Sequence, residues 1–95
     1  MALKLKHQTA DQFAGRFWIA VQRAQDAGDK IEFSRLMYWI ERKLVARDIT
    51  DDQVSKGFNS VFERTLDATQ WTQARTNRVK EAHGRYAAML AEGDL

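Results

Sequence analysis

The chain contains no cysteine and no proline. Without cysteine it cannot form disulfides, bind zinc through thiolates or use a cysteine nucleophile. Without proline, no residue interrupts a long helix by removing a backbone donor. No apolar run approaches the roughly 20 residues of a membrane-spanning helix, and the N-terminal stretch lacks the apolar core of a signal peptide. These absences favour a soluble helical protein, and we expect it to be cytoplasmic.

Catalytic and ligand-binding motifs are absent as well. The histidines are His7 and His83, and neither has a second metal ligand at helical spacing, so each is expected to be a solvated side chain. Ser34, Ser55 and Ser60 stand outside any nucleophile motif. The glycines are scattered and form no phosphate-binding loop. We therefore expect a protein that is not an enzyme and that binds no metal and no cofactor.

The residues that are present suit one small folded domain. A chain of 95 residues leaves little room for two domains, so we assign 1–95 to one domain, with a flexible basic arm at 1–8 and a frayed tail at 92–95. Hydrophobic residues make up 44% and charged residues 29%, the mixture of a globular rather than a disordered protein. The formal charge of +2 permits contact with nucleic acid or an acidic protein without requiring it.

Capping signals divide the chain into helices. Thr9–Gln12 and Thr50–Gln53 are capping boxes, Gly28 suits the left-handed position after a helix, and Asp29 and Asp67 can cap the helices that follow them. The short connections favour antiparallel neighbours, although the shorter third helix leaves a less regular packing open. The sequence thus predicts an all-α fold, a compact four-helix domain of antiparallel, bundle-like character, with helices near 10–27, 30–47, 51–65 and 68–91.

Two features of this pattern concern helix packing. The last helix is roughly 36 Å long against roughly 27 Å for the first, so its end is expected to project past the others. Gly57 stands inside the third helix, where glycine costs about 1 kcal/mol relative to alanine. A close helix crossing at Gly57 would explain its presence there.

The helix expected at 30–47 carries two apolar stripes. Its main stripe follows helical spacing, and a second stripe is made by residues seven apart, Ile31, Tyr38 and Val45. Trp39 lies off both stripes, and Trp18 lies off the apolar face of the first helix. A helix with two stripes is either the centre of the core or a core helix whose second face meets another chain. The main stripe consists of Phe33, Leu36, Met37, Ile40 and Leu44.

The surplus of large apolar residues gives the first functional hypothesis. Aromatic residues next to an arginine, such as Tyr38 and Trp39 beside Arg42, have the composition of interface hot spots. We therefore expect a non-enzymatic protein–protein interaction module that binds itself as a homo-oligomer, a different protein, or both. Its small size suits a bacterial or phage accessory protein such as an adaptor or inhibitor. The expected partner-binding residues are Trp18, Ile31, Tyr38, Trp39, Arg42 and Val45.

The alternative hypothesis is a small helical module that binds nucleic acid. Arg75, Arg78 and Arg85 lie on or beside one face of the last helix, and rows of helical arginines bind phosphates. Long basic side chains beside an apolar stripe also commonly cover core residues. The sequence does not decide between these two roles for the arginines.

Overall fold

The computed structural model describes residues 9–63 and 68–93. The capping box at Thr9 is present: the N–H of Gln12 donates to the Thr9 hydroxyl, and the N–H of Thr9 donates to the Gln12 side chain. It begins α1 (Ala10–Ala27), which ends at Gly28 with φ of 66°. Asp29 then accepts from the N–H of Glu32 and begins α2 (Lys30–Val45).

The second capping box, at Thr50, begins α3 (Asp51–Phe62). This helix ends before the expected residue 65, because Glu63 takes the left-handed conformation with φ of 53°. The helix expected at 30–47 also ends early, at Val45, and Arg47 has φ of 61°. The predicted arm at 1–8, the predicted cap at Asp67 and the last two residues of the tail lie outside the described residues.

The last helix is continuous but not uniform. It consists of α4 (Ala68–Ala74), a π-helical segment η1 (Arg75–Val79) and α5 (Lys80–Glu92). Within it the N–H of Lys80 donates to the carbonyl of Arg75, five residues earlier. A π segment takes up one residue more than an α turn, so it rotates everything after it by about 100° relative to a regular α-helix. Trp71 and Val79 are therefore both buried although they are eight residues apart.

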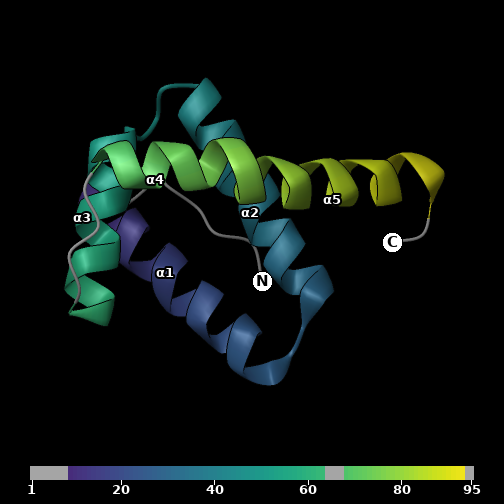
Figure 1. The fold of residues 1–95 in the computed structure, drawn as a ribbon, viewed down its shortest axis with the longest axis horizontal. Helices are drawn as coiled ribbons and strands as arrows, with labels where there is room; N and C mark the ends of the chain where they lie inside the picture. Colours follow the sequence, from purple (N-terminus) through teal and green to yellow (C-terminus); the bar gives the residue numbers. More distant parts are fainter. Residues whose placement is uncertain (1–8, 64–67, 94–95) are drawn as a thin grey trace.

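The all-α, four-helix architecture is confirmed, with the last helix counted as one. The packing is the less regular kind: α1 and α2 diverge from the turn at Gly28, and the last helix lies across α2 (Figure 1). α1 packs mainly on α3, and α2 packs mainly on α5. The end of α5 projects past the rest of the domain, as its length predicts (Figure 1). Within the described ranges no helix is long and apolar enough to cross a membrane.

Trp18 stands at the centre of the core. Its ring lies edge-on to Phe17, Phe58, Phe62 and Trp71, with centroid separations of 4.9, 5.0, 6.0 and 5.4 Å. Its indole N–H donates to the carbonyl of Val54 at 2.8 Å, which ties α1 to α3. Edge-to-face rings add to the energy of burial. The expectation that Trp18 is a partner-binding residue is therefore wrong, since it is buried in this chain's own core.

Gly57 lies where α3 crosses α1 most closely. A Cβ built on Gly57 would stand 2.7 Å from the Cβ of Ala14 and 2.9 Å from its carbonyl carbon. No side chain larger than hydrogen fits there without moving the helices, so the close crossing suggested by this glycine is confirmed.

Candidate functional site

The second stripe of α2 is only partly covered by the chain itself. The Tyr38 ring stacks on His83 of α5, with centroids 4.9 Å apart and an interplanar angle of 13°. Tyr86, one turn later on α5, lies 5.3 Å from Tyr38 in a tilted arrangement. All three rings remain half-buried rather than buried. The three rings therefore lie at the edge of the contact between α2 and α5, where they are partly exposed to solvent.

An arginine and a tryptophan of α2 extend this edge. The Arg42 guanidinium lies over the Tyr38 ring, 5.5 Å from its centroid, and donates to the Tyr38 hydroxyl at 3.1 Å. Trp39 meets Tyr38 edge-on at 6.4 Å and is half-buried. Arg42 is exposed, so the guanidinium donors that Tyr38 does not use are accessible to solvent.

The two ends of the second stripe are open. Ile31 is 51% exposed and Val45 is 76% exposed, although both are large aliphatic side chains. No part of the described chain buries them. Together with the rings and Arg42 they make up a set of side chains on one side of α2 and α5, which we call the α2–α5 surface: Ile31, Tyr38, Trp39, Arg42, Val45, His83 and Tyr86.

A shallow pocket adjoins this surface beside Val45. Its walls are both apolar and basic: Ala46 continues the aliphatic area, and Arg42 and Lys80 supply the charge. The pocket's one carboxylate, Glu41, pairs with Arg75 instead of with these cations. The pocket therefore suits an apolar group that carries a nearby negative charge. Its lining residues are Glu41, Arg42, Val45, Ala46, Lys80 and His83.

Arg35 borders the surface on the Tyr86 side. Its guanidinium donates to both carboxylate oxygens of Glu32, three residues earlier on α2. This hydrogen bonding raises the pKa of Arg35 above its ordinary value, so the side chain stays charged. Because Glu32 balances that charge, Arg35 adds little net attraction for an anionic partner.

Arg75 does not belong to a free row of arginines. Its side chain donates to Asp51 of α3, with Nε–Oδ1 at 3.0 Å, and to Glu41 of α2, with Nη1–Oε1 at 3.3 Å. Trp71 donates to the same Asp51 oxygen at 2.6 Å. Arg75 therefore ties three helices together, and its charge is already paired with two carboxylates of the same chain.

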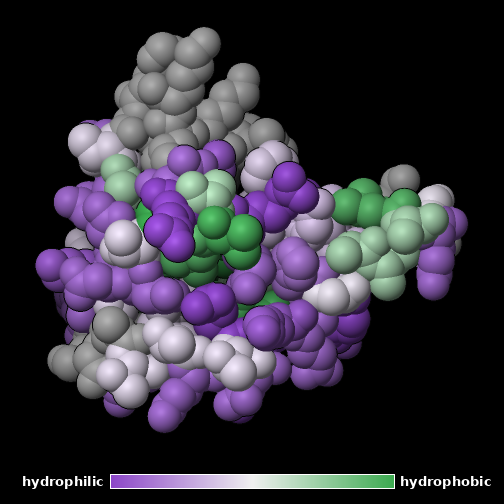
Figure 2. Space-filling model, turned by 90° about the horizontal axis from the view of Figure 1, so that it is seen from above, coloured by the Kyte–Doolittle hydropathy of each residue, from purple (hydrophilic) through white to green (hydrophobic). Residues whose placement is uncertain are grey.

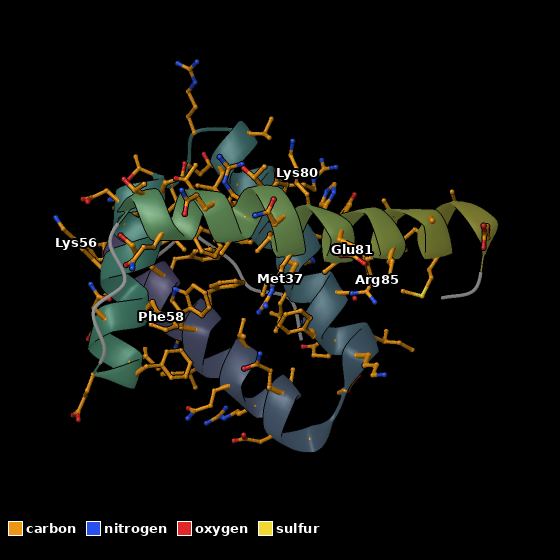
Figure 3. All side chains as sticks on the ribbon, viewed as in Figure 1. Met37, Lys56, Phe58, Lys80, Glu81 and Arg85 are labelled. Carbon is orange, nitrogen blue, oxygen red and sulfur yellow. The ribbon has the colours of Figure 1, made fainter. Side chains whose placement is uncertain are left out.

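The other two arginines of the expected row are exposed but separated from Arg75. In an uninterrupted α-helix Arg78 would stand within about 20° of Trp71 around the axis. The π segment turns it away to solvent, and Arg85 is exposed in the same way. Figure 3 shows Arg85 on the opposite side of α5 from Lys80. The last helix thus presents scattered cations and no continuous basic stripe.

Sequence reasoning missed two members of the α2–α5 surface. His83 was expected to be an isolated solvated histidine, yet it stacks on Tyr38. Tyr86 was not among the expected partner-binding residues, yet it lies half-buried beside Tyr38. Both residues lie on the face of α5 that packs on α2. Their contacts with Tyr38 depend on where the two helices cross, which the sequence does not give. Among residues 9–63 and 68–93 no group of histidines and carboxylates is placed to hold a metal ion.

The α2–α5 surface thus has aromatic rings at its centre, aliphatic side chains at its ends and a basic pocket at one side. Comparison with protein-family models, with characterised proteins and with solved structures finds no significant match, so function has to be argued from this surface.

Proposed function

We propose that this chain is a non-enzymatic protein–protein interaction module, of the adaptor or inhibitor type, that self-associates through the α2–α5 surface. The observation that carries the proposal is the stack of Tyr38 on His83, left half-exposed between two open aliphatic residues, Ile31 and Val45. The chemistry of this area is that of a binding surface rather than of a solvated helix face.

Composition supports this proposal. Tyrosine, tryptophan and arginine are the residues most enriched where binding energy concentrates in protein interfaces. Here Tyr38 contacts both Trp39 and Arg42, which lie within about one turn of it on α2. The Tyr38 side chain loses little conformational entropy on binding, because its stack on His83 of α5 already holds it in place.

Exposure supports it too. A solvated helix face is expected to be charged or polar, and single exposed aliphatic residues need no explanation. In this case two of them, Ile31 and Val45, stand two turns either side of the same tyrosine on one face of α2. Covering both residues and the Tyr38 ring between them would remove apolar area from water on this face of α2.

Sedimentation equilibrium over a concentration series tests the proposal. We expect the wild-type mass to rise with concentration, and Ile31→Glu and Val45→Glu each to weaken self-association roughly tenfold, since a new charge would be placed in an apolar contact. Ile19→Glu is the matched control, because Ile19 is 40% exposed on α1, away from the α2–α5 surface.

Two outcomes contradict the proposal. One is a strictly monomeric chain that also retains no protein partner in a pull-down. The other is self-association that Ile31→Glu and Val45→Glu leave as strong as Ile19→Glu does. A mobility shift of DNA or RNA that weakens steeply with salt and is lost in Arg78→Glu would instead favour the nucleic-acid hypothesis.

A further inference from the structure

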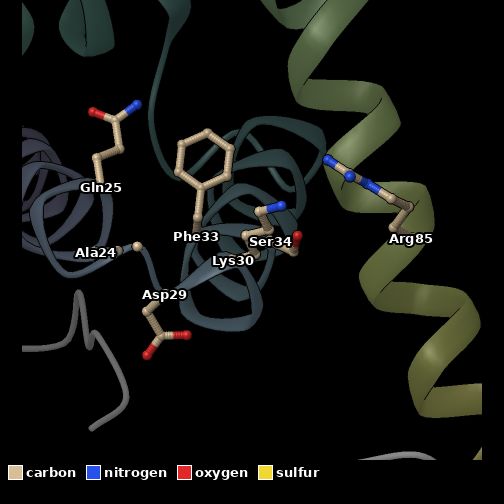
Figure 4. A pocket seen from close by; sticks show the side chains of 8 residues that line it. Ala24, Gln25, Asp29, Lys30, Phe33, Ser34 and Arg85 are labelled. Atoms are coloured by element: carbon tan, nitrogen blue, oxygen red, sulfur yellow. The ribbon is translucent and has the colours of Figure 1, made fainter.

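A pocket of about 400 Å³ lies between α5 and the turn that joins α1 to α2. Its volume falls within the roughly 300–1,000 Å³ of small-molecule sites. Figure 4 shows the Arg85 side chain extending from α5 toward the side chains at the start of α2. We call this site the Arg85 pocket, and none of its lining residues belongs to the α2–α5 surface. The lining includes Ala24, Asp29, Lys30, Phe33, Ser34 and Arg85.

Two cations line the Arg85 pocket from different helices. Lys30 stands in the first turn of α2 and Arg85 in α5, and both side chains are exposed. Neither forms an ion pair with residues 9–63 or 68–93. The planar fork of an arginine matches the two oxygens of a carboxylate, and a lysine adds a point charge. The pocket therefore offers donors to an anion from both sides.

Asp29 is the one carboxylate of the lining, and it already has a structural role. It caps α2, because its Oδ1 accepts from the N–H of Glu32 at 2.9 Å. Figure 4 shows its carboxylate directed away from Phe33 and Arg85. Two cations and one carboxylate leave the lining with a formal charge of +1. A ligand with a single negative charge balances this lining, whereas the charge of about −2 on a phosphate monoester exceeds it.

Ser34 adds a hydroxyl to the pocket. Its residue is only 4% exposed, and its side chain forms no hydrogen bond with the part of the chain that the structure describes. A polar group that is withdrawn from water without a partner costs free energy. Ser34 follows Lys30 by four residues, so both lie on one side of α2. A ligand oxygen between α2 and α5 would supply the hydrogen bond that Ser34 lacks.

The remaining part of the pocket is apolar. Phe33 packs against the core but is only half-buried, so part of its side chain stays open to the pocket that it lines. Beside it the end of α1 contributes the small residue Ala24, and Gly28 follows without a side chain. A planar ring can lie against a phenyl ring where no large side chain intervenes. The apolar part therefore suits an aromatic group.

We propose that the Arg85 pocket binds a small aromatic carboxylate. The carboxylate accepts from Arg85, Lys30 and Ser34, and the ring lies against Phe33. Such a ligand contacts both the α1–α2 turn and α5, so it stabilises the folded chain in proportion to its occupancy. This inference goes beyond the proposed function and does not depend on self-association, because the pocket and the α2–α5 surface have no residue in common.

Titration of the full chain with benzoate, followed through amide chemical shifts by NMR, tests the proposal. We expect saturable shifts centred on Lys30, Ser34 and Arg85, and a melting temperature that rises with benzoate concentration. Arg85→Gln should raise the dissociation constant roughly tenfold, since a charged hydrogen bond is lost, and Ser34→Ala roughly threefold. Arg78→Gln makes the same change on an exposed arginine of η1, outside the pocket, and should leave the dissociation constant unchanged. Benzamide, which has the same shape without the charge, should bind roughly tenfold more weakly than benzoate.

A second control concerns the hydrophobic surface on the projecting end of α5 (Figure 2). Leu90 is 44% exposed there, so an aromatic probe could associate with that end instead of with the pocket. Leu90→Glu should therefore leave the dissociation constant for benzoate unchanged. The inference is overturned if no shift saturates, if benzamide binds as tightly as benzoate, or if Arg85→Gln binds as wild type does. Phenyl phosphate that binds more tightly than benzoate would likewise overturn the assignment of a carboxylate ligand. None of these results alters the prediction for self-association, which is measured with Ile31→Glu and Val45→Glu.

Discussion

Replacing Gly57 with alanine probes the closest packing in the domain. Alanine is the better helix former by about 1 kcal/mol in a helix interior. Its Cβ, however, would stand 2.7 Å from the Cβ of Ala14 and 2.9 Å from a backbone carbon. A backbone atom cannot rotate away, so α1 and α3 must separate, and overpacking of this kind costs about 1–3 kcal/mol. Since the contact is severe, we expect a net loss of about 1–2 kcal/mol.

Gly15→Ala is the matched control for this experiment. Gly15 stands inside α1, directly after Ala14, and a Cβ there meets nothing within 4 Å. It should therefore show the propensity gain alone, up to about 1 kcal/mol. For a domain of this size each 1 kcal/mol moves the melting temperature by about 4–8 °C. Circular dichroism melts of the two variants should then shift in opposite directions.

The double variant Ala14→Gly/Gly57→Ala measures how much of the loss of stability in Gly57→Ala comes from the contact between the two Cβ atoms. Removing the Cβ of Ala14 relieves the shortest contact but leaves the contact with its backbone carbon. Because Ala14→Gly by itself costs about 1 kcal/mol in a helix interior, the double variant is compared with the single variant Ala14→Gly. We expect Gly57→Ala to cost less in the Ala14→Gly background than in wild type. A Gly57→Ala protein that melts at or above the wild-type temperature would refute this account of the crossing.

Three further substitutions separate core residues from surface residues. Arg75→Gln should lower the free energy of unfolding by about 2 kcal/mol in urea titrations, because Glu41 keeps a buried carboxylate without its cation; unchanged stability would contradict the structural role. Trp18→Phe should cost about 2 kcal/mol by the same assay, since Val54 loses its indole donor and a gap opens; a neutral effect would mean that the bond adds nothing. Tyr38→Glu should keep a cooperative melt with a loss near 1 kcal/mol while self-association fails; simultaneous loss of helix and cooperativity would return Tyr38 to the core.

The helices were largely predictable because their ends are decided by local chemistry. Thr9 and Thr50 cap through side chains three residues from their partners, and Gly28 adopts the left-handed conformation that the sequence suggested. The early end of α3 was not predictable, since Glu63 is a non-glycine residue at positive φ and carries no such signal.

The candidate site was predicted in part. Hydrophobic periodicity shows which residues share a face of a helix, but it does not show which other helix packs on that face. The second stripe of α2 is real, yet Tyr38 is covered by α5 whereas Ile31 and Val45 are not. Trp18 was misplaced for a related reason. α1 packs on both α2 and α3, so it buries a wider arc than a single apolar stripe indicates.

The three arginines Arg75, Arg78 and Arg85 do not share one face of the last helix, for a geometric reason. Its prediction assumed 3.6 residues per turn throughout the last helix, and η1 breaks that assumption. Thr76 and Asn77 of η1 are weak helix formers, but such residues are common in ordinary α-helices and do not predict a π segment. Only the contacts of Trp71, Arg75 and Val79 reveal the change of register.

The π segment also defines where this helix tolerates a change in length. Its hydrogen bonding is that of an α-helix that has accepted one inserted residue. Deleting Thr76 or Asn77, both exposed, would join α4 to α5 as one regular α-helix and keep Trp71 and Val79 on the same face. A deletion anywhere in α5 would instead rotate the residues beyond it by about 100°. Natural relatives of this chain that have one residue fewer in this helix should therefore lack it between Arg75 and Val79 rather than between the buried residues Val79 and Ala82.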